Sequence, residues 1–121
     1  MIVSLLISRK INNDKKILEK NISEIELFIK NNIPKNTVIQ MGSVLTTEIR
    51  NPLEEYGYQF FIKKQHRGAA LYDSNLEMIK TSDMVLIINL DQSSNMTAFE
   101  EYAKEQTAAH RSVFVLSLSS D

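Results

Sequence analysis

Short, continuously apolar runs alternate along the chain with longer stretches in which apolar residues recur every three or four positions. A strand buried on both faces produces the first pattern, and a helix with one buried face produces the second. Their alternation is typical of βαβ units in a parallel sheet. The apolar runs predict five strands, at residues 2–7, 38–41, 58–62, 84–88 and 113–116.

Four helices are predicted between these strands. The first follows the cap-forming cluster at residues 12–14, shows one apolar face from Ile17 to Ile29, and is ended by Pro34. The second ends at Gly57, a residue type that is common after a helix. The second, third and fourth helices are expected at residues 46–56, 68–80 and 96–109.

Right-handed crossovers leave few topologies for such a chain. We expect one α/β domain over residues 1–121, a Rossmann-like three-layer sandwich with a five-stranded parallel sheet in the order 3-2-1-4-5. The apolar stretch at the N-terminus is seven residues long, too short for a membrane span and poorly shaped for a signal peptide. A soluble, cytoplasmic protein is therefore expected.

The composition excludes several kinds of site and partner. The chain has no cysteine, which excludes disulfides, thiol nucleophiles and cysteine zinc sites, and its two histidines are too few for most metal sites. A formal net charge of −1 gives no global field for nucleic acid or an anionic membrane. We expect no metal, no cofactor, no nucleic-acid partner and no membrane partner. Frequent Lys, Asn and Ile suggest an AT-rich genome, such as that of a low-GC bacterium or its phage.

Three loops are expected to converge on one edge of the sheet. Ligands of open parallel sheets bind at the carboxyl ends of the strands where the strand order reverses, here between the first and fourth strands. The loops that meet there contain Ser8 and Arg9, Gly42 and Ser43, and residues 91–95. Small and polar residues also form turns and caps, but three such loops at one edge favour a ligand site.

One segment carries a family resemblance. Residues 82–103 read SDMVLIINLDQSSNMTAFEEYA, an apolar strand, a Ser/Asp-rich turn and then Thr-x-x-Glu on a helix. The segment resembles the C-terminal half of nucleoside 2-deoxyribosyltransferases and their N-glycosidase relatives. It also resembles the SLOG superfamily of SMF/LOG-type Rossmann-like nucleotide-binding proteins. Residues 68–78, with Gly68, Asn75 and Met78, resemble a second SLOG motif, and Ser8-Arg9 resembles the opening motif of the group.

The chain departs from both patterns at several positions. Of the glycine-rich loop that SLOG proteins carry after the second strand, only Gly42 is present. In the transferases, acidic residues flank the catalytic glutamate, and here Asn75 and Ser94 fall nearest those positions. Thr97 and Glu100 match the pattern, with Glu100 at the position of the nucleophile.

Three functions follow from these observations. The resemblance implies first a small protein that binds a nucleotide or an ADP-ribose-type ligand, with sequestration of a signalling nucleotide in phage–bacteria conflict as its role. The alternative is an enzyme, a nucleoside deoxyribosyltransferase or nucleotide N-glycosidase, in which Glu100 acts on the sugar carbon. The third is an interaction module without catalysis. We favour the binder, because Asp73 and Asp91 are the nearest second carboxylates and neither lies on a motif position.

Glu100 also has a simpler interpretation, as a surface residue paired with Lys104 one helical turn away. Arg67, next to Gly68, is a candidate phosphate contact. A homo-oligomer is expected, since small domains of this kind often dimerise. The residues expected to contact a ligand are Ser8, Arg9, Gly42, Ser43, Arg67, Asn75, Asp91, Ser93, Ser94, Asn95, Thr97 and Glu100.

Overall fold

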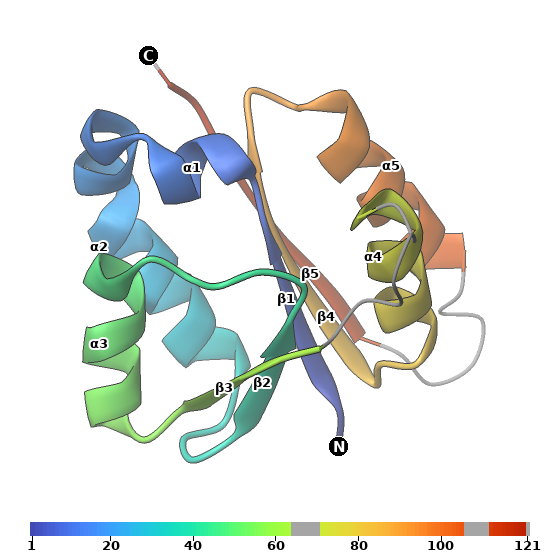
Figure 1. The fold of residues 1–121 in the computed structure, drawn as a ribbon, viewed down its shortest axis with the longest axis horizontal. Coiled ribbons are helices and arrows are strands. Elements are labelled where there is room, and N and C mark those ends of the chain that lie inside the picture. The colour runs from blue at the N-terminus through green and yellow to red at the C-terminus, as the bar shows by residue number, and fades with distance from the viewer. Residues whose placement is uncertain (64–70, 106–111, 121) are drawn as a thin grey trace.

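The computed structural model describes residues 1–63, 71–105 and 112–120. Strands and helices alternate along these residues, as the periodicity predicts (Figure 1). In chain order they are β1 (Val3–Ile7), α1 (Arg9–Asn13), α2 (Lys15–Asn32), β2 (Val38–Met41), α3 (Thr47–Tyr56), β3 (Gln59–Ile62), α4 (Leu71–Lys80), β4 (Met84–Leu90), α5 (Ser94–Glu105) and β5 (Ser112–Leu118).

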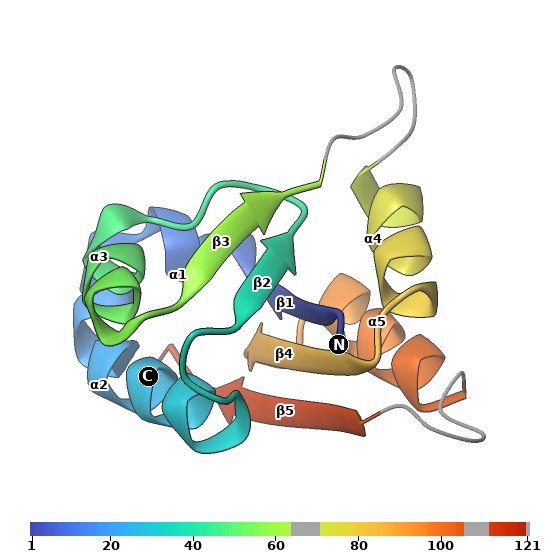
Figure 2. The ribbon, with the colours of Figure 1, turned by 90° about the horizontal axis from the view of Figure 1, so that it is seen from below.

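The five strands form one parallel sheet in the order β3-β2-β1-β4-β5, which confirms the predicted fold class. Figure 2 shows the strands in this order, with β3 and β5 at the edges. In Figure 1 the helices α1, α2 and α3 cover one face of the sheet, and α4 and α5 cover the other. The molecule is therefore the expected three-layer sandwich.

Burial on both faces explains the continuous apolar runs. Leu5 of β1 packs into the cluster shared with α1, α2 and α3, while its neighbour Leu6 packs into the cluster shared with α4 and α5. Residues 85–88 of β4 are completely buried and divide between the same two clusters. Successive side chains of a strand point to opposite faces, so a strand covered on both sides requires apolar residues at every position.

The start of the first helix differs from the expectation. Residues 9–13 form the short helix α1, which the pattern does not predict, and α2 begins only after Asp14. The carboxylate of Asp14 caps α2 by accepting hydrogen bonds from the backbone N–H groups of Lys16 (3.0 Å) and Ile17 (3.3 Å). Of the predicted capping cluster, only Asp14 performs that role.

Several other boundaries shift by a few residues. The strand β4 continues two residues beyond the predicted end, and α5 begins two residues earlier than predicted. Tyr58 precedes β3 and is buried, and its hydroxyl donates to the carbonyl oxygen of Ile33 (2.7 Å). The predicted start of the third helix at residue 68 and the end of the fourth at residue 109 lie outside the described residues.

Gly57 ends α3 as predicted. Its φ of +117° lies in the region that residues with a Cβ atom rarely adopt, and its N–H bonds back to the last turn of the helix. Pro52 lies inside α3 without ending it. Among the described residues, no helix is both long enough and apolar enough to span a bilayer.

Candidate functional site

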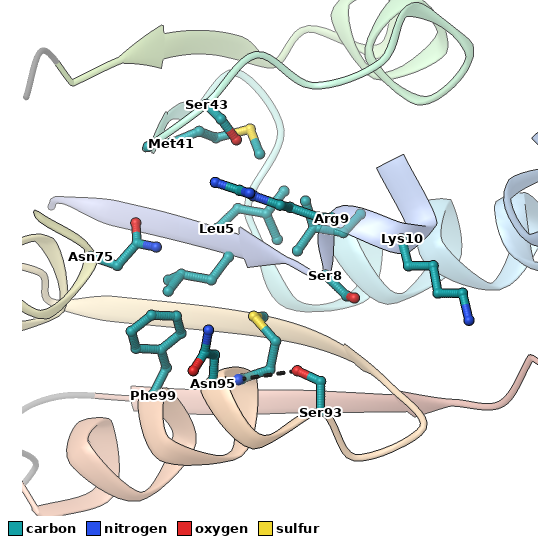
Figure 3. Close-up of a pocket in the computed structure, with 14 residues that line it drawn as sticks. Leu5, Ser8, Arg9, Lys10, Met41, Ser43, Asn75, Ser93, Asn95 and Phe99 are labelled. Atoms are coloured by element: carbon teal, nitrogen blue, oxygen red, sulfur yellow. Dashed lines mark hydrogen bonds between the residues drawn. The ribbon is translucent and has the colours of Figure 1, made fainter. Parts of the chain in front are cut away.

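A cavity of about 400 Å³ lies at the carboxyl end of β1, beside the point where the strand order reverses between β1 and β4. This is the edge at which the topology places a ligand site. Figure 3 shows the cavity from close range. Its lining comprises Leu5, Leu6, Ile7, Ser8, Arg9, Lys10, Met41, Gly42, Ser43, Asn75, Ser93, Asn95, Met96 and Phe99.

Four parts of the fold supply these residues. The end of β1 and the start of α1 contribute residues 5–10, and the loop after β2 contributes Gly42 and Ser43. Asn75 comes from α4, and residues 93–99 come from the turn after β4 and the first turns of α5. The cavity therefore combines residues from the first part of the chain, up to Ser43, with residues from the second part, from Asn75 to Phe99.

Among the described residues of the lining, the charged side chains are those of Arg9 and Lys10, and both are cationic. Arg9 extends along the cavity toward Met41 and Ser43, whereas the ammonium group of Lys10 points away from it (Figure 3). Within the described residues, the guanidinium of Arg9 has neither an ion pair nor a hydrogen bond. No acidic residue is part of the lining over residues 1–63, 71–105 and 112–120. The cavity thus offers an unneutralised guanidinium, the group best suited to bind carboxylate or phosphate.

The inner part of the cavity is apolar. Leu6 and Met41 lie on neighbouring strands, Met96 and Phe99 lie on α5, and all four side chains are almost completely buried. An apolar interior with a few polar groups at its rim is typical of small-molecule sites.

Seven of the residues predicted to contact a ligand line this cavity. They are Ser8, Arg9, Gly42, Ser43, Asn75, Ser93 and Asn95. Arg67 lies outside the described residues. The structure adds seven lining residues that are not among the predicted contact residues: Leu5, Leu6, Ile7, Lys10, Met41, Met96 and Phe99. The signal for Lys10 is its place next to Arg9 after an apolar strand, whereas Met96 and Phe99 have the spacing of ordinary core residues.

Four predicted contact residues lie outside the lining. The carboxylate of Asp91 accepts hydrogen bonds from the backbone N–H (3.0 Å) and the hydroxyl (2.6 Å) of Ser120. These bonds stabilise the charged form and hold the pKa of Asp91 below its ordinary value. Ser94 is exposed at the start of α5. Thr97 accepts a hydrogen bond from the carboxamide of Asn89 (3.3 Å).

Glu100 is the fourth of these residues. Its carboxylate oxygen Oε1 lies 2.7 Å from Nζ of Lys104, which is the surface pair that the sequence offers as the simpler interpretation. The contact between Glu100 and a ligand sugar stays a prediction, as do the ligand contacts of Asp91, Ser94 and Thr97.

Two asparagines outside the lining form hydrogen bonds with the backbone of the segments that carry lining residues. Nδ2 of Asn12 donates to the carbonyl oxygen of Val44 (3.0 Å), and its Oδ1 accepts from the backbone N–H of Thr46 (2.8 Å), so α1 is tied to the loop after Ser43. Asn89 is buried at the end of β4, where its Oδ1 accepts from the backbone N–H of Ser93 (3.0 Å). The sequence gives neither residue this role.

Within the described residues, no group of three or more His, Cys, Asp or Glu side chains is arranged to hold a metal ion. Comparisons of the chain with protein-family models, with curated proteins and with solved structures found no match. The resemblance to the SLOG superfamily and to the deoxyribosyltransferases therefore stays a prediction from the motifs. The expected homo-oligomer and cytoplasmic location stay predictions as well.

Proposed function

We propose that this protein binds a nucleotide-derived small molecule in the cavity at the end of β1 and holds it without cleaving it. One observation carries the proposal: the guanidinium of Arg9 lies along a cavity that has an apolar interior and, as far as the structure describes the chain, no acidic residue in its lining. A ligand that combines an anionic group with an apolar ring system matches these two features.

The polar groups of the rim support the anionic end of this ligand. The lining also contains two hydroxyl-bearing residues: Ser43, toward which the Arg9 side chain extends, and Ser8, which precedes Arg9 in the chain (Figure 3). A guanidinium presents several N–H donors in a fixed plane and binds two phosphate oxygens at once, and hydroxyl groups add further donors. Such a set favours a phosphate over a neutral sugar.

None of the described lining residues carries a carboxylate, which favours binding over cleavage. Hydrolysis or transfer of an N-glycosidic bond requires a carboxylate near the sugar carbon, and commonly a second one. Glu100 pairs with Lys104, Asp91 is held by Ser120, and Asp73 is exposed on α4. A protein that holds a signalling nucleotide without turnover is suited to sequester it, which is the biological role that we propose.

A thermal-shift and calorimetry experiment tests this proposal. The purified chain is titrated with adenine and guanine nucleotides, NAD and ADP-ribose at millimolar concentration. A ligand at 100 times its Kd stabilises the folded state by about 2.7 kcal/mol, which raises the melting temperature by several degrees. Arg9→Gln should weaken binding at least tenfold, whereas Lys16→Gln, which removes an exposed cation outside the lining, should not.

Two results would contradict the proposal. A flat response of the melting temperature to the whole panel would remove its basis. Release of free base by the wild-type chain, abolished in Glu100→Gln, would replace the binder with the glycosidase. We expect no base release. Binding that is at least tenfold weaker in Glu100→Gln would support the predicted contact between Glu100 and the ligand sugar, whereas unaltered binding would assign Glu100 to its pair with Lys104 alone.

A further inference from the structure

We infer that the outer edge of β3 is a docking surface for a second copy of this chain, which pairs with it as an antiparallel strand around a two-fold axis at Phe61. Figure 2 shows β3 at one edge of the sheet. The inference does not depend on the proposed function, because none of the residues of β3 lines the cavity at the end of β1. It gives a location to the homo-oligomer that the sequence predicts.

The two edge strands of the sheet differ in how well they are covered. The helices α2 and α5 pack against β5, and the apolar side chains of β5 are buried or half-buried. On β3, Phe61 is 55% exposed and Ile62 is 36% exposed, and these neighbouring side chains point to opposite faces of the sheet. β3 also contains no charged residue and no proline, the features by which edge strands commonly avoid pairing. The β3 edge therefore exposes apolar side chains on both faces.

The pairing of β3 with β2 determines which backbone groups of β3 point outward. The backbone N–H groups of Gln59 and Lys63 donate to carbonyl oxygens on the β2 side (3.1 and 2.9 Å). Because a parallel ladder uses alternate residues, Phe61 is also directed inward, while Phe60 and Ile62 direct their N–H and C=O groups outward. Among the described residues, no strand pairs with this side of β3. The edge thus presents two donors and two acceptors to a partner strand.

These outward groups favour one register for a second β3. When Phe60 of one copy lies opposite Ile62 of the other, the two residues exchange two N–H···O bonds, as in the hydrogen-bonded pairs of an antiparallel sheet. The two-fold axis repeats this pair, so all the outward donors and acceptors of both strands are used. Phe61 then faces its own copy at a closely spaced pair, where aromatic side chains stabilise a sheet. A shift that places Phe60 opposite Phe60 would instead pair Ile62 with Tyr58, whose N–H already donates to the carbonyl oxygen of Leu53.

The charges near the strand suit this register. Lys63 follows β3 directly and lies opposite the uncharged Gln59 of the other copy. The two Lys63 residues are then separated by four residues along the strands, about 14 Å. This separation exceeds the screening length of roughly 8 Å at physiological ionic strength, so their repulsion is weak.

A groove beside the edge adds apolar surface to the contact. It has a volume of about 260 Å³ and lies between β3, α3 and the loop after β2. Phe60 and Ile62 line it together with Val44, which is 60% exposed. In the proposed register, Ile62 of the second copy lies opposite Phe60 and therefore at this groove. Association removes these side chains from water, which favours the dimer.

The contact is small for a protein interface. A standard stable interface buries about 1,600 Å² in total, whereas this one consists of one short strand from each copy and its flanking side chains. We therefore expect a weak dimer that dissociates on dilution. The partner strand has the same free groups and no charge of its own, so a second copy satisfies the edge without another protein.

Analytical ultracentrifugation and hydrogen exchange by NMR test the inference. We expect the chain to sediment as a monomer at micromolar concentration and increasingly as a dimer toward millimolar concentration. Over the same range, the outward amides of Phe60 and Ile62 should become at least tenfold more protected, because dilute monomers leave them open to water. The amide of Phe61, which is directed toward β2 in monomer and dimer alike, should change less.

Two variants assign the dimer to this edge. Phe61→Lys places two like charges opposite each other at the two-fold axis and should weaken dimerisation at least tenfold. Ile62→Pro removes one outward N–H from each copy and leaves the pairing with β2 intact, since proline is tolerated where the N–H faces outward. It should also weaken dimerisation at least tenfold. Ser117→Lys, at an exposed position of β5, is the matched control and should change nothing. If Ile62→Pro lowers the melting temperature, Phe61→Lys decides.

A charge introduced at Gln59 tests the register. Gln59→Glu places a carboxylate opposite Lys63 of the other copy and should tighten the dimer several-fold at low salt, whereas Gln59→Lys should weaken it. Equal dimerisation of these two variants would overturn the register with Phe61 at the axis.

Three results would overturn the docking surface itself. The first is a monomer at every concentration, and the second is a dimer that both Phe61→Lys and Ile62→Pro leave unchanged. The third is protection of the Phe60 and Ile62 amides that does not depend on concentration, because the chain would then cover its own edge. None of these results bears on ligand binding in the cavity, which is measured separately.

Discussion

Asn12 and Asn89 each hold two backbone segments with one short side chain. Asn12 joins α1 to the loop after β2, and Asn89 joins the end of β4 to the turn before α5. These are the segments that carry Arg9, Ser43 and Ser93 into the lining of the cavity. Because a site binds well only when its polar groups are held in place before the ligand arrives, both asparagines are positioning residues for ligand binding.

Replacement of Asn89 tests this role. Asn89→Ala removes the donor to Thr97 and one of two acceptors for the Ser93 N–H, which keeps only its bond to the carbonyl oxygen of Leu90 (3.2 Å). We expect the free energy of unfolding to fall by about 1–3 kcal/mol, and the affinity for the nucleotide that binds in the cavity to fall with it. Urea denaturation and calorimetry measure the two effects. The exposed Asn51→Ala serves as the control, and a loss in Asn89→Ala no larger than in that control would contradict the role.

The neighbouring residues Phe99 and Glu100 show what the sequence pattern leaves open. Thr-x-x-Glu marks the helix correctly, but successive residues of a helix are rotated by about 100° around its axis. Met96, Phe99 and Ala103 form the buried face of α5, and Glu100 lies at the margin of that face, where its side chain is 23% exposed and pairs with Lys104. A motif fixes the spacing of its residues, whereas the packing of the helix decides which of them face the cavity.

Among the secondary-structure elements, the turn between β4 and α5 is the most constrained part of the site. Asp91 and Gln92 both have a positive φ, of 52° and 50°, a conformation that is uncommon outside glycine. Hydrogen bonds from the backbone N–H and hydroxyl of Ser120 to the Asp91 carboxylate tie this turn to the segment after β5. The end of β5 thereby fixes a turn that leads directly into Ser93.

The tie to Ser120 predicts a pH dependence of stability. The pKa of Asp91 in the folded state is lower than its ordinary value of 3.8, chiefly because the Ser120 side chain donates to the charged carboxylate. Since the folded state binds the proton more weakly than the unfolded state, the stabilisation is complete above the ordinary value. It is lost as the pH falls through the lowered pKa. The unfolding free energy of the wild type should therefore exceed that of Asp91→Asn above the ordinary pKa, and this difference should shrink as the pH falls through the lowered pKa.

Urea denaturation at a series of pH values from neutral to about pH 2 measures this difference. Ser120→Ala keeps the carboxylate and the backbone donor but removes the hydroxyl, so its pH dependence should be weaker than that of the wild type. Identical pH profiles for all three chains would contradict the assignment.

The strands could be predicted from the sequence more fully than the helices. For β2 the predicted and observed bounds are identical, because a strand buried on one or both faces is marked by its own residues. For α1 the sequence contains one buried apolar residue, Ile11, in a helix too short for any periodicity to show. The helix α1 begins with Arg9 and Lys10. Because the helix was not predicted, the sequence did not indicate how these two side chains are directed relative to the cavity.

Across the whole molecule, burial is uneven between the middle of the sheet and its β3 edge. The interior strand β4 is buried along almost its entire length. At the β3 edge, Phe61 is 55% exposed and Val38 of the adjoining β2 is 51% exposed. The helices α4 and α5 pack mainly against β1, β4 and β5. The cavity lies beside β1 and β4, the two strands whose side chains are most completely buried.

This gradient predicts the order of amide hydrogen exchange among the strands. Exchange requires local opening, and opening costs least where few apolar contacts are lost. We expect the amides of β4 and β1 to exchange most slowly and those of β3 to exchange most rapidly. Exchange measured by mass spectrometry with peptides that cover each strand provides the test. Protection of β3 equal to that of β4 would show that the edge is covered in solution.

The cavity lies where β1 meets β4, and two distant stretches of the chain supply its lining. Residues up to Ser43 provide the guanidinium, and residues from Asn75 to Phe99 provide the carboxamides. A chain divided after β3 would give two fragments, each with half of a binding site. Ligand occupancy would then depend on the product of the two fragment concentrations. Fused to two other proteins, the fragments would report the encounter of those proteins through the capture of a small molecule.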